Sequence, residues 1–144
     1  MIYEVSNGGY SISTDKRKLN IPTIHNFLRK SYWAKNKPIY LVKKSIKGSI
    51  CFGVYYHKRQ VGFARVITDL TTFGYLADVF IIPEYQGKGL GKFLIQTIMA
   101  CPDFHGFRSW SLATRDAHGL YAQFGFKEMD NPKIWMRKVN FTAY

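Results

Sequence analysis

The chain alternates between stretches with a two-residue apolar repeat and stretches with a helical one. Residues 2–14 alternate apolar and polar side chains around Asn7-Gly8-Gly9, a turn sequence typical of a tight hairpin. Residues 49–56 and 61–70 are rich in Val, Ile, Phe and Tyr and are joined by a short polar connection. These two stretches predict a second hairpin.

Residues 74–82 are apolar on both alternating faces apart from one acid, Asp78. This pattern is typical of a central strand that is covered on both sides. Pro83 cannot donate a hydrogen bond to a neighbouring strand, so the strand should end there. Further strands are predicted near residues 107–113 and 134–139.

Four stretches show the apolar spacing of a helix. Asn20 and Pro22 are typical of a helix start, because Asn accepts a hydrogen bond from an early N–H and Pro needs none. Asp116 is the predicted cap of the last helix and Gly125 its end. Three predicted helices span about residues 20–30, 38–47 and 117–124. A further predicted helix starts at the glycines at 87–91 and ends at residue 100.

The chain has 144 residues, which gives room for one domain of ordinary size. In order, the elements read β-α-α-β-β-β-α-β-α-β. We therefore predict a single α/β (α+β) domain over residues 1–144, with a mixed, mostly antiparallel central sheet flanked by about four helices.

Composition and charge limit the classes of protein to which the chain can belong. Apolar residues make up 47% of the chain and aromatic residues 17%, which excludes disorder as a description of the whole chain. The formal net charge of +12 predicts an anionic partner. Cys51 and Cys101 belong to no C-x-x-C pair and the histidines show no metal spacing, so we expect no disulfide framework and no metal. We also expect no signal peptide and no membrane span, hence a cytoplasmic protein.

A glycine cluster within residues 83–92 lies between a predicted buried strand and an amphipathic helix. Free backbone N–H groups and the positive end of a helix make such a place an anion site. A Walker loop is excluded, because Gln86 stands at its first glycine position and Phe93 follows Lys92. A Rossmann fingerprint is improbable, because its glycine spacing fails and the strand comes late in a mostly antiparallel run.

The pattern that does match is Q-x-x-G-x-G, formed by Gln86, Gly89 and Gly91. With it the chain resembles the GNAT N-acetyltransferase superfamily, from about residue 20 to 138. Residues 120–126 look like the Y-x-x-x-G-F segment of that family. Residues 62–66, 75–80 and 114–121 resemble a bacterial subgroup of it.

The resemblance implies a GNAT-like fold with acetyl-CoA (CoA) as cosubstrate. Backbone amides of the glycine loop would bind the pyrophosphate, and the strand before it would face the pantetheine, beside a splay in the sheet. The implied cofactor-binding residues are Val79, Phe80, Ile81, Gln86, Gly87, Lys88, Gly89, Leu90, Gly91, Lys92, Thr114 and Tyr121.

Tyr121 matches the position of the family's catalytic tyrosine, which would donate its phenolic proton to the CoA sulfur. The alternative is a core aromatic, because Ala117, Leu120, Tyr121 and Phe124 follow helical spacing.

Asp78 is the second candidate catalytic residue. A carboxylate on an apolar strand must be paired, hydrogen-bonded, protonated or open to a water-filled cleft. In the family an acid on this strand often serves as general base. The alternative is a structural acid bonded to backbone or to a basic side chain such as Arg65.

Tyr32 and Trp33 lie where the family places its acceptor site, and an aromatic wall suits an amine through cation–π contact. The alternative is a satellite hydrophobic cluster.

These residues predict an enzyme that transfers acetyl from acetyl-CoA to a primary amine of a small molecule or protein, by direct attack in a ternary complex. A homodimer is possible. One alternative is a non-catalytic acyl-CoA-binding regulatory module. A nucleic-acid-binding protein is less favoured, because the basic clusters are not interleaved with an aromatic platform.

Overall fold

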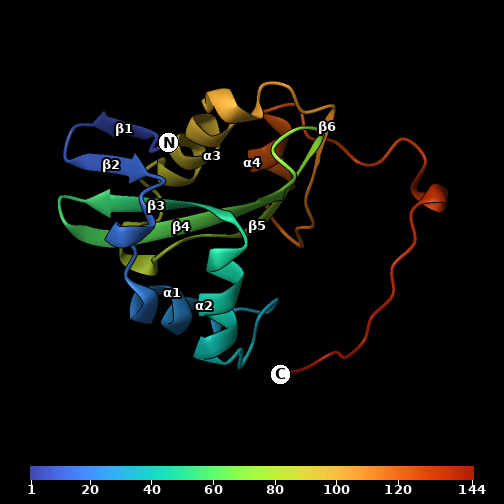
Figure 1. Cartoon of the computed structure of the whole chain (residues 1–144), viewed down its shortest axis with the longest axis horizontal. Coiled ribbons are helices and arrows are strands. Elements are labelled where there is room, and N and C mark those ends of the chain that lie inside the picture. Colours follow the sequence, from blue (N-terminus) through green and yellow to red (C-terminus); the bar gives the residue numbers. More distant parts are fainter.

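A six-stranded sheet runs through the molecule in the computed structural model, which describes residues 1–144 (Figure 1). The strands lie in chain order, and each pair from β1 to β5 is antiparallel. Only β5 and β6 run parallel. The prediction of a mixed, mostly antiparallel sheet is therefore confirmed. The strands are β1 (Glu4–Asn7), β2 (Tyr10–Ser13), β3 (Ile50–Tyr56), β4 (Arg59–Thr68), β5 (Phe73–Ile81) and β6 (Ser109–Ser111).

Four α-helices cover the two faces of the sheet, as predicted. In Figure 1, α1 and α2 lie on one face, and α3 and α4 lie on the other. The Asn20 side chain accepts a hydrogen bond from the Thr23 N–H, which confirms the predicted start of the first helix. The helices are α1 (Ile21–Leu28), α2 (Ile39–Lys47), α3 (Leu90–Ala100) and α4 (His118–Ala122).

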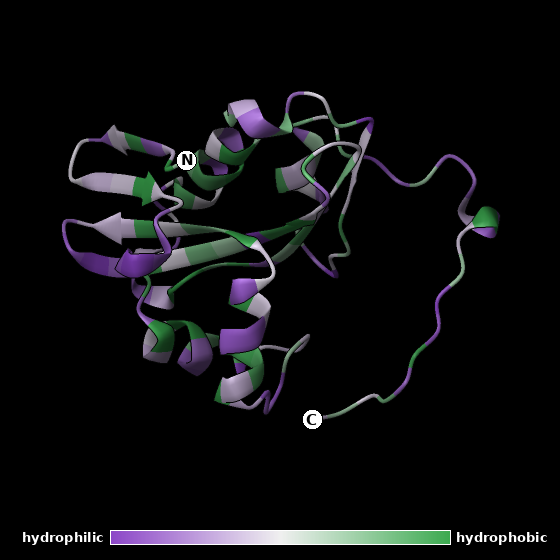
Figure 2. Cartoon of the chain, viewed as in Figure 1, coloured by the Kyte–Doolittle hydropathy of each residue, from purple (hydrophilic) through white to green (hydrophobic).

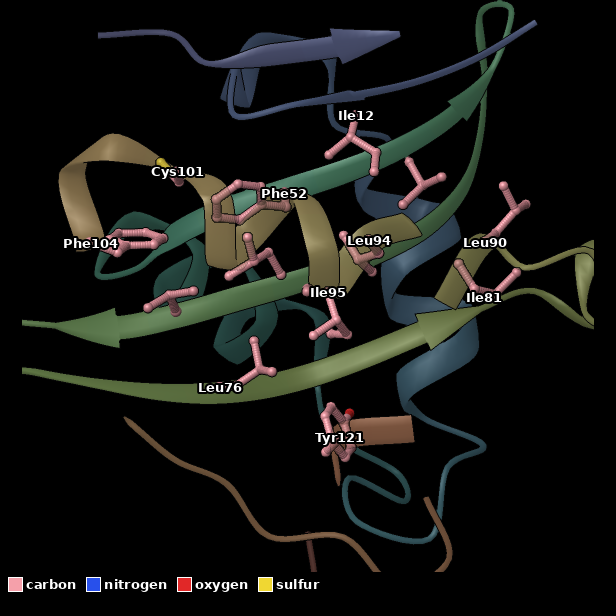
Figure 3. Packing of buried hydrophobic residues seen from close by; sticks show 14 of the residues in the cluster. Ile12, Phe52, Leu76, Ile81, Leu90, Leu94, Ile95, Cys101, Phe104 and Tyr121 are labelled. Carbon is pink, nitrogen blue, oxygen red and sulfur yellow. The ribbon is translucent and has the colours of Figure 1, made fainter. Parts of the chain in front are cut away.

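Each face of the sheet has its own apolar core. Figure 3 shows the larger core, in which Leu94 and Ile95 of α3 pack on Phe52 of β3 and Leu76 of β5. The smaller core joins α1 and α2 to Phe63 of β4 and Phe80 of β5. As predicted for residues 74–82, β5 is covered on both faces. It is not central in the sheet, because it lies next to the edge strand β6.

The predicted strand at 134–139 is wrong. Residues 127–144 leave the sheet and form only a short 3-10 turn, Pro132–Ile134. The edge strand β6 has three residues, which is too short to pair with a strand of six. Figure 2 shows several hydrophobic residues on this segment, away from the sheet. Ile134, Trp135 and Met136 are among its exposed side chains.

The predicted cap of the last helix is also wrong. Asp116 lies before α4, but Ala117 stands at the cap position and has no capping side chain. The Thr114 hydroxyl accepts a hydrogen bond from the Ala117 N–H instead (3.0 Å). Gly125 does follow the helix with φ +88°, the left-handed conformation expected of a glycine after a helix end.

Candidate active site

The sheet opens between β5 and β6. The two strands pair only at Phe73 with Ser109, Gly74 with Trp110 and Tyr75 with Ser111. From Leu76 to Ile81 the edge of β5 that faces β6 has no strand partner, while its other edge stays paired with β4. Backbone groups of Val79, Phe80 and Ile81 are thus available to a ligand that lies along this edge.

The glycine loop begins where this open edge ends. None of the backbone N–H groups from Gly87 to Lys92 donates to an acceptor within the chain, whereas Gln86 N–H and Phe93 N–H on either side do. These free donors stand at the positive end of α3, so the loop can bind an anion. Lys88 and Lys92 are exposed and add positive charge.

Two glycines give the loop its shape. Gly87 has φ +78° and Gly89 has φ +79°, which is the left-handed region. A Cβ placed on either would meet no heavy atom within 4 Å, so packing in the free protein does not require glycine there. The Gln86 side chain donates to the Ile81 carbonyl (2.8 Å) and ties the loop to the end of β5.

Asp78 lies in an irregular turn of β5. The register of β4 with β5 shifts between Phe63 and Arg65, and Asp78 has φ +54°. Its carboxylate accepts hydrogen bonds from Arg65 Nε (2.6 Å) and from Trp33 Nε1 (2.9 Å), one on each oxygen. Arg65 also donates to the Ser49 hydroxyl (3.1 Å). The basic partner that the sequence suggested for Asp78, Arg65, is therefore present.

Tyr121 belongs to α4 and lies at the margin of the larger core (Figure 3). Burial raises the pKa of its hydroxyl to about 12, with a further contribution from Tyr32, so the group is protonated at neutral pH. No buried polar atom of a side chain other than the Tyr55 hydroxyl is left without a partner. The Tyr121 hydroxyl bonds no protein group, so solvent or a ligand can reach it.

Tyr32 and Trp33 connect the two candidate catalytic residues. Their rings meet edge to face, with centroids 5.1 Å apart. Trp33 donates to Asp78, and Tyr32 lies close enough to Tyr121 to act on its pKa. The structure therefore brings Tyr32, Trp33, Asp78 and Tyr121 together from three separate segments.

Arg115 was not singled out as a site residue by its sequence. Its guanidinium lies 3.9 Å from the centre of the Tyr32 ring, and its backbone N–H donates to the Tyr32 hydroxyl (3.1 Å). These contacts fix Tyr32 against the segment that leads into α4. Thr114, a predicted cofactor residue, is half-buried, and its hydroxyl accepts the hydrogen bond from the Ala117 N–H just before α4.

Cys51 lies on the α1 and α2 side of the sheet and is buried. Burial raises the pKa of its thiol to about 11, so the thiolate is scarce at neutral pH. Nowhere do three His, Cys, Asp or Glu side chains gather closely enough to hold a metal ion. None of the helices combines the length and apolar character needed to cross a bilayer.

The fold is of the α/β class, with a sheet that opens beside a helix start whose N–H groups are free. Comparisons with known proteins identify its family. Residues 47–128 match the acetyltransferase (GNAT) domain family. A protein of Gibberella zeae that is named as an acetyltransferase is 32% identical over an alignment that covers 85% of this chain and 82% of that protein.

Solved structures were compared with this chain as well. A GNAT-family acetyltransferase structure from Xanthomonas campestris pv. campestris has a TM-score of 0.89 and 46% identity, over 93% of this chain and 95% of that one. An N-acetylglutamate synthase from Neisseria gonorrhoeae, complexed with coenzyme A and L-arginine, has a TM-score of 0.68 at 18% identity. That match covers 88% of this chain and 29% of the synthase, and it shows the shared fold alone.

The chain belongs to the GNAT family of N-acetyltransferases, as its resemblance predicted.

Proposed function

We propose that residues 1–144 form one catalytic domain that binds acetyl-CoA and transfers the acetyl group to a primary amine by direct attack in a ternary complex. The observation that carries this proposal is the continuous path from the unpaired edge of β5 to the free N–H groups of the glycine loop. This path suits an elongated cosubstrate with a pyrophosphate at one end.

Acetyl-CoA would lie with its pyrophosphate on the N–H groups from Gly87 to Lys92. Its pantetheine would run along Val79–Ile81, and residues 112–114 would line the other side. The net charge of +12 favours the approach of this polyanion. The bound coenzyme A of the gonococcal synthase, which shares the fold, is consistent with such a site.

In the transfer step the neutral amine attacks the thioester carbonyl carbon, a C–N bond forms and the C–S bond breaks. The leaving thiolate takes the hydroxyl proton of Tyr121, and the proton lost by the attacking amine passes through water and restores the Tyr121 hydroxyl. A hydroxyl with a pKa of about 12 remains protonated until the thiolate forms, as an acid in this role must.

Asp78 acts in this scheme as a positioning residue. Both of its oxygens already accept hydrogen bonds, from Trp33 and from Arg65. It holds the Trp33 indole beside Tyr32, and so fixes the aromatic wall that we propose for the acceptor amine.

A route through an acetyl-cysteine has little support. The Cys51 thiol is buried, and its raised pKa of about 11 leaves it a weak nucleophile. Direct transfer needs no such intermediate.

The test is release of CoA thiol from acetyl-CoA in the presence of a panel of primary amines, with mass spectrometry of the acetylated products. We expect amine-dependent release, and a fall of roughly 10²–10⁴ in kcat for Tyr121→Phe at nearly unchanged acetyl-CoA affinity. The Tyr40→Phe variant removes an exposed phenol on α2, away from the proposed site, and is the matched control. Binding of acetyl-CoA without transfer to any amine would favour a regulatory module, and unchanged turnover in Tyr121→Phe would remove its acid role.

A further inference from the structure

The C-terminal segment, residues 127–144, carries a run of exposed apolar side chains. Met136 is 97% exposed and Ile134 is 71% exposed. Large side chains have on the order of 200 Å² of surface each, so the exposed ones of this segment present roughly 600 Å² to water. A monomeric protein rarely leaves so much apolar surface in one patch, which marks the segment as an interaction surface. The exposed large apolar side chains in its second half are Ile134, Trp135, Met136, Val139 and Phe141.

The backbone of the segment is unpaired as well. None of the N–H groups from Met136 to Tyr144 donates to a backbone carbonyl of the chain. Trp135, where the 3-10 turn ends, is already extended, with φ −89° and ψ 133°. A row of free N–H and C=O groups is a template on which another extended segment can pair. Residues 134–139 therefore have a strand-like sequence and lack only a neighbour.

A second copy of this chain offers the neighbour that one chain lacks. Figure 2 shows the segment away from the sheet, and the edge strand β6 has only three residues. The second copy brings a segment of matching length, its own residues 134–139. Because the two segments are identical, a two-fold axis lets each serve as the neighbour of the other, and the contact closes at two copies.

The order of charges along the segment favours an antiparallel arrangement. Glu128 and Asp130 precede the exposed apolar residues, and Arg137 and Lys138 follow the first three of them. Antiparallel segments bring the acids of one copy toward the cations of the other, whereas parallel segments would place like charges together. A two-fold axis perpendicular to the segments produces the antiparallel arrangement.

We infer that two copies of this chain associate through their C-terminal segments, with residues 134–139 of each copy paired antiparallel to the same residues of the other. The exposed apolar side chains supply most of the roughly 800 Å² that each partner of a stable complex buries. The inference concerns assembly and does not depend on the proposed function.

The same contact bears on a pocket of about 600 Å³ in each copy. Phe141 and Tyr144 line this pocket together with Tyr32 and Trp33. Pairing at residues 134–139 holds the chain that leads to Phe141 and Tyr144. The second copy therefore fixes one wall of the pocket.

The first test is sedimentation velocity of the purified full chain over a dilution series. The wild type should sediment as a dimer. The double variant Ile134→Asp with Met136→Asp puts two carboxylates on one face of the paired segment and should weaken the dimer at least about 100-fold, because burial of unpaired charge is costly. Tyr40→Asp adds a charge at an exposed aromatic position of α2 and should leave the dimer unchanged.

Both variants should melt cooperatively, because the substituted side chains are exposed in the single chain. A wild type that is monomeric throughout the series would overturn the inference. A double variant as dimeric as the wild type would overturn the role of the C-terminal segment.

Amide hydrogen exchange tests the pairing itself. The N–H groups within residues 134–139 that bond to the second copy should exchange more slowly in the wild type than in the double variant. A wild-type dimer in which all of them exchange as fast as in the double variant would place the interface elsewhere and overturn the inference.

Discussion

Asp78 is held in a conformation that residues other than glycine adopt infrequently. Its φ of +54° falls in the left-handed region, where Asp is among the better tolerated side chains. The irregular register beside it turns the carboxylate onto the face of Arg65 and Trp33. One backbone angle therefore sets both the ion pair and the position of the aromatic wall.

Asp78→Asn separates positioning from base catalysis. The amide keeps an acceptor for Trp33 but leaves Arg65 mostly buried without its counter-charge, so we expect a loss of about 3–5 kcal/mol in the free energy of unfolding. The acceptor KM should rise while the pH dependence of the rate keeps its shape. Urea unfolding and a pH–rate profile measure the two effects. A profile that loses its acidic limb in the variant would instead assign Asp78 as the base.

Two buried tyrosines predict a loss of stability at alkaline pH. Burial raises the pKa of Tyr121 to about 12 and also raises that of Tyr55, whereas both titrate near 10 in the unfolded chain. Their contribution is full below about pH 10 and is lost as the pH rises through the folded-state values, because the unfolded chain releases these protons first.

At about pH 11 this difference amounts to on the order of 1 kcal/mol for Tyr121. Urea unfolding at about pH 8 and about pH 11 should show a smaller decrease for Tyr121→Phe than for the wild type. The same decrease in both proteins would show that Tyr121 has an ordinary pKa.

At the scale of elements, the apolar periodicity of the sequence predicted a strand or helix correctly where that element buries one apolar stripe. Residues 39–47 and 90–100 are helices as predicted, and the two hairpins are present. The segment 134–139 has a strand-like sequence, but a strand needs a neighbour, and the edge offered by β6 is too short. The irregularity at Asp78 could not be predicted either, because an inserted residue leaves no mark in a strand that is apolar on both faces.

The turn into α3 depends on glycine at position 89 more than at position 91. Gly89 has φ +79°, so Gly89→Ala should lower the free energy of unfolding by roughly 1–2 kcal/mol. It should also weaken acetyl-CoA binding about tenfold or more, because the loop N–H groups no longer converge.

Gly91→Ala is the matched control, because the added methyl would lie at an ordinary 3.7 Å from Leu120 in a helical conformation. It should leave acetyl-CoA affinity intact and stabilise the fold by up to about 1 kcal/mol. Calorimetry of acetyl-CoA binding with both variants checks the pair. Equal affinities in the two variants would contradict the proposed role of the loop.

At the scale of the whole molecule, the candidate site was predictable in its parts but not in its assembly. The glycine pattern indicated the loop, and the lone acid on an apolar strand indicated Asp78. The hydrogen bond from Trp33 to Asp78 joins residues 45 positions apart, and no local pattern specifies it.

The C-terminal segment lines, together with Tyr32 and Trp33, a pocket of about 600 Å³ that the sequence did not predict. Phe141 and Tyr144 meet edge to face and remain exposed.

The possible homodimer and the cytoplasmic location stay predictions.

The most direct test of the account is a thermal melt with acetyl-CoA, CoA, ATP and NADH in parallel. A ligand at about 100 times its dissociation constant adds roughly 2.7 kcal/mol, so the two CoA species should raise the melting temperature by several degrees and the others should not. The same shift in Gly91→Ala and a smaller one in Gly89→Ala would locate the binding at the glycine loop. A cooperative melt that acetyl-CoA leaves unchanged would contradict the central claim that this protein binds acetyl-CoA.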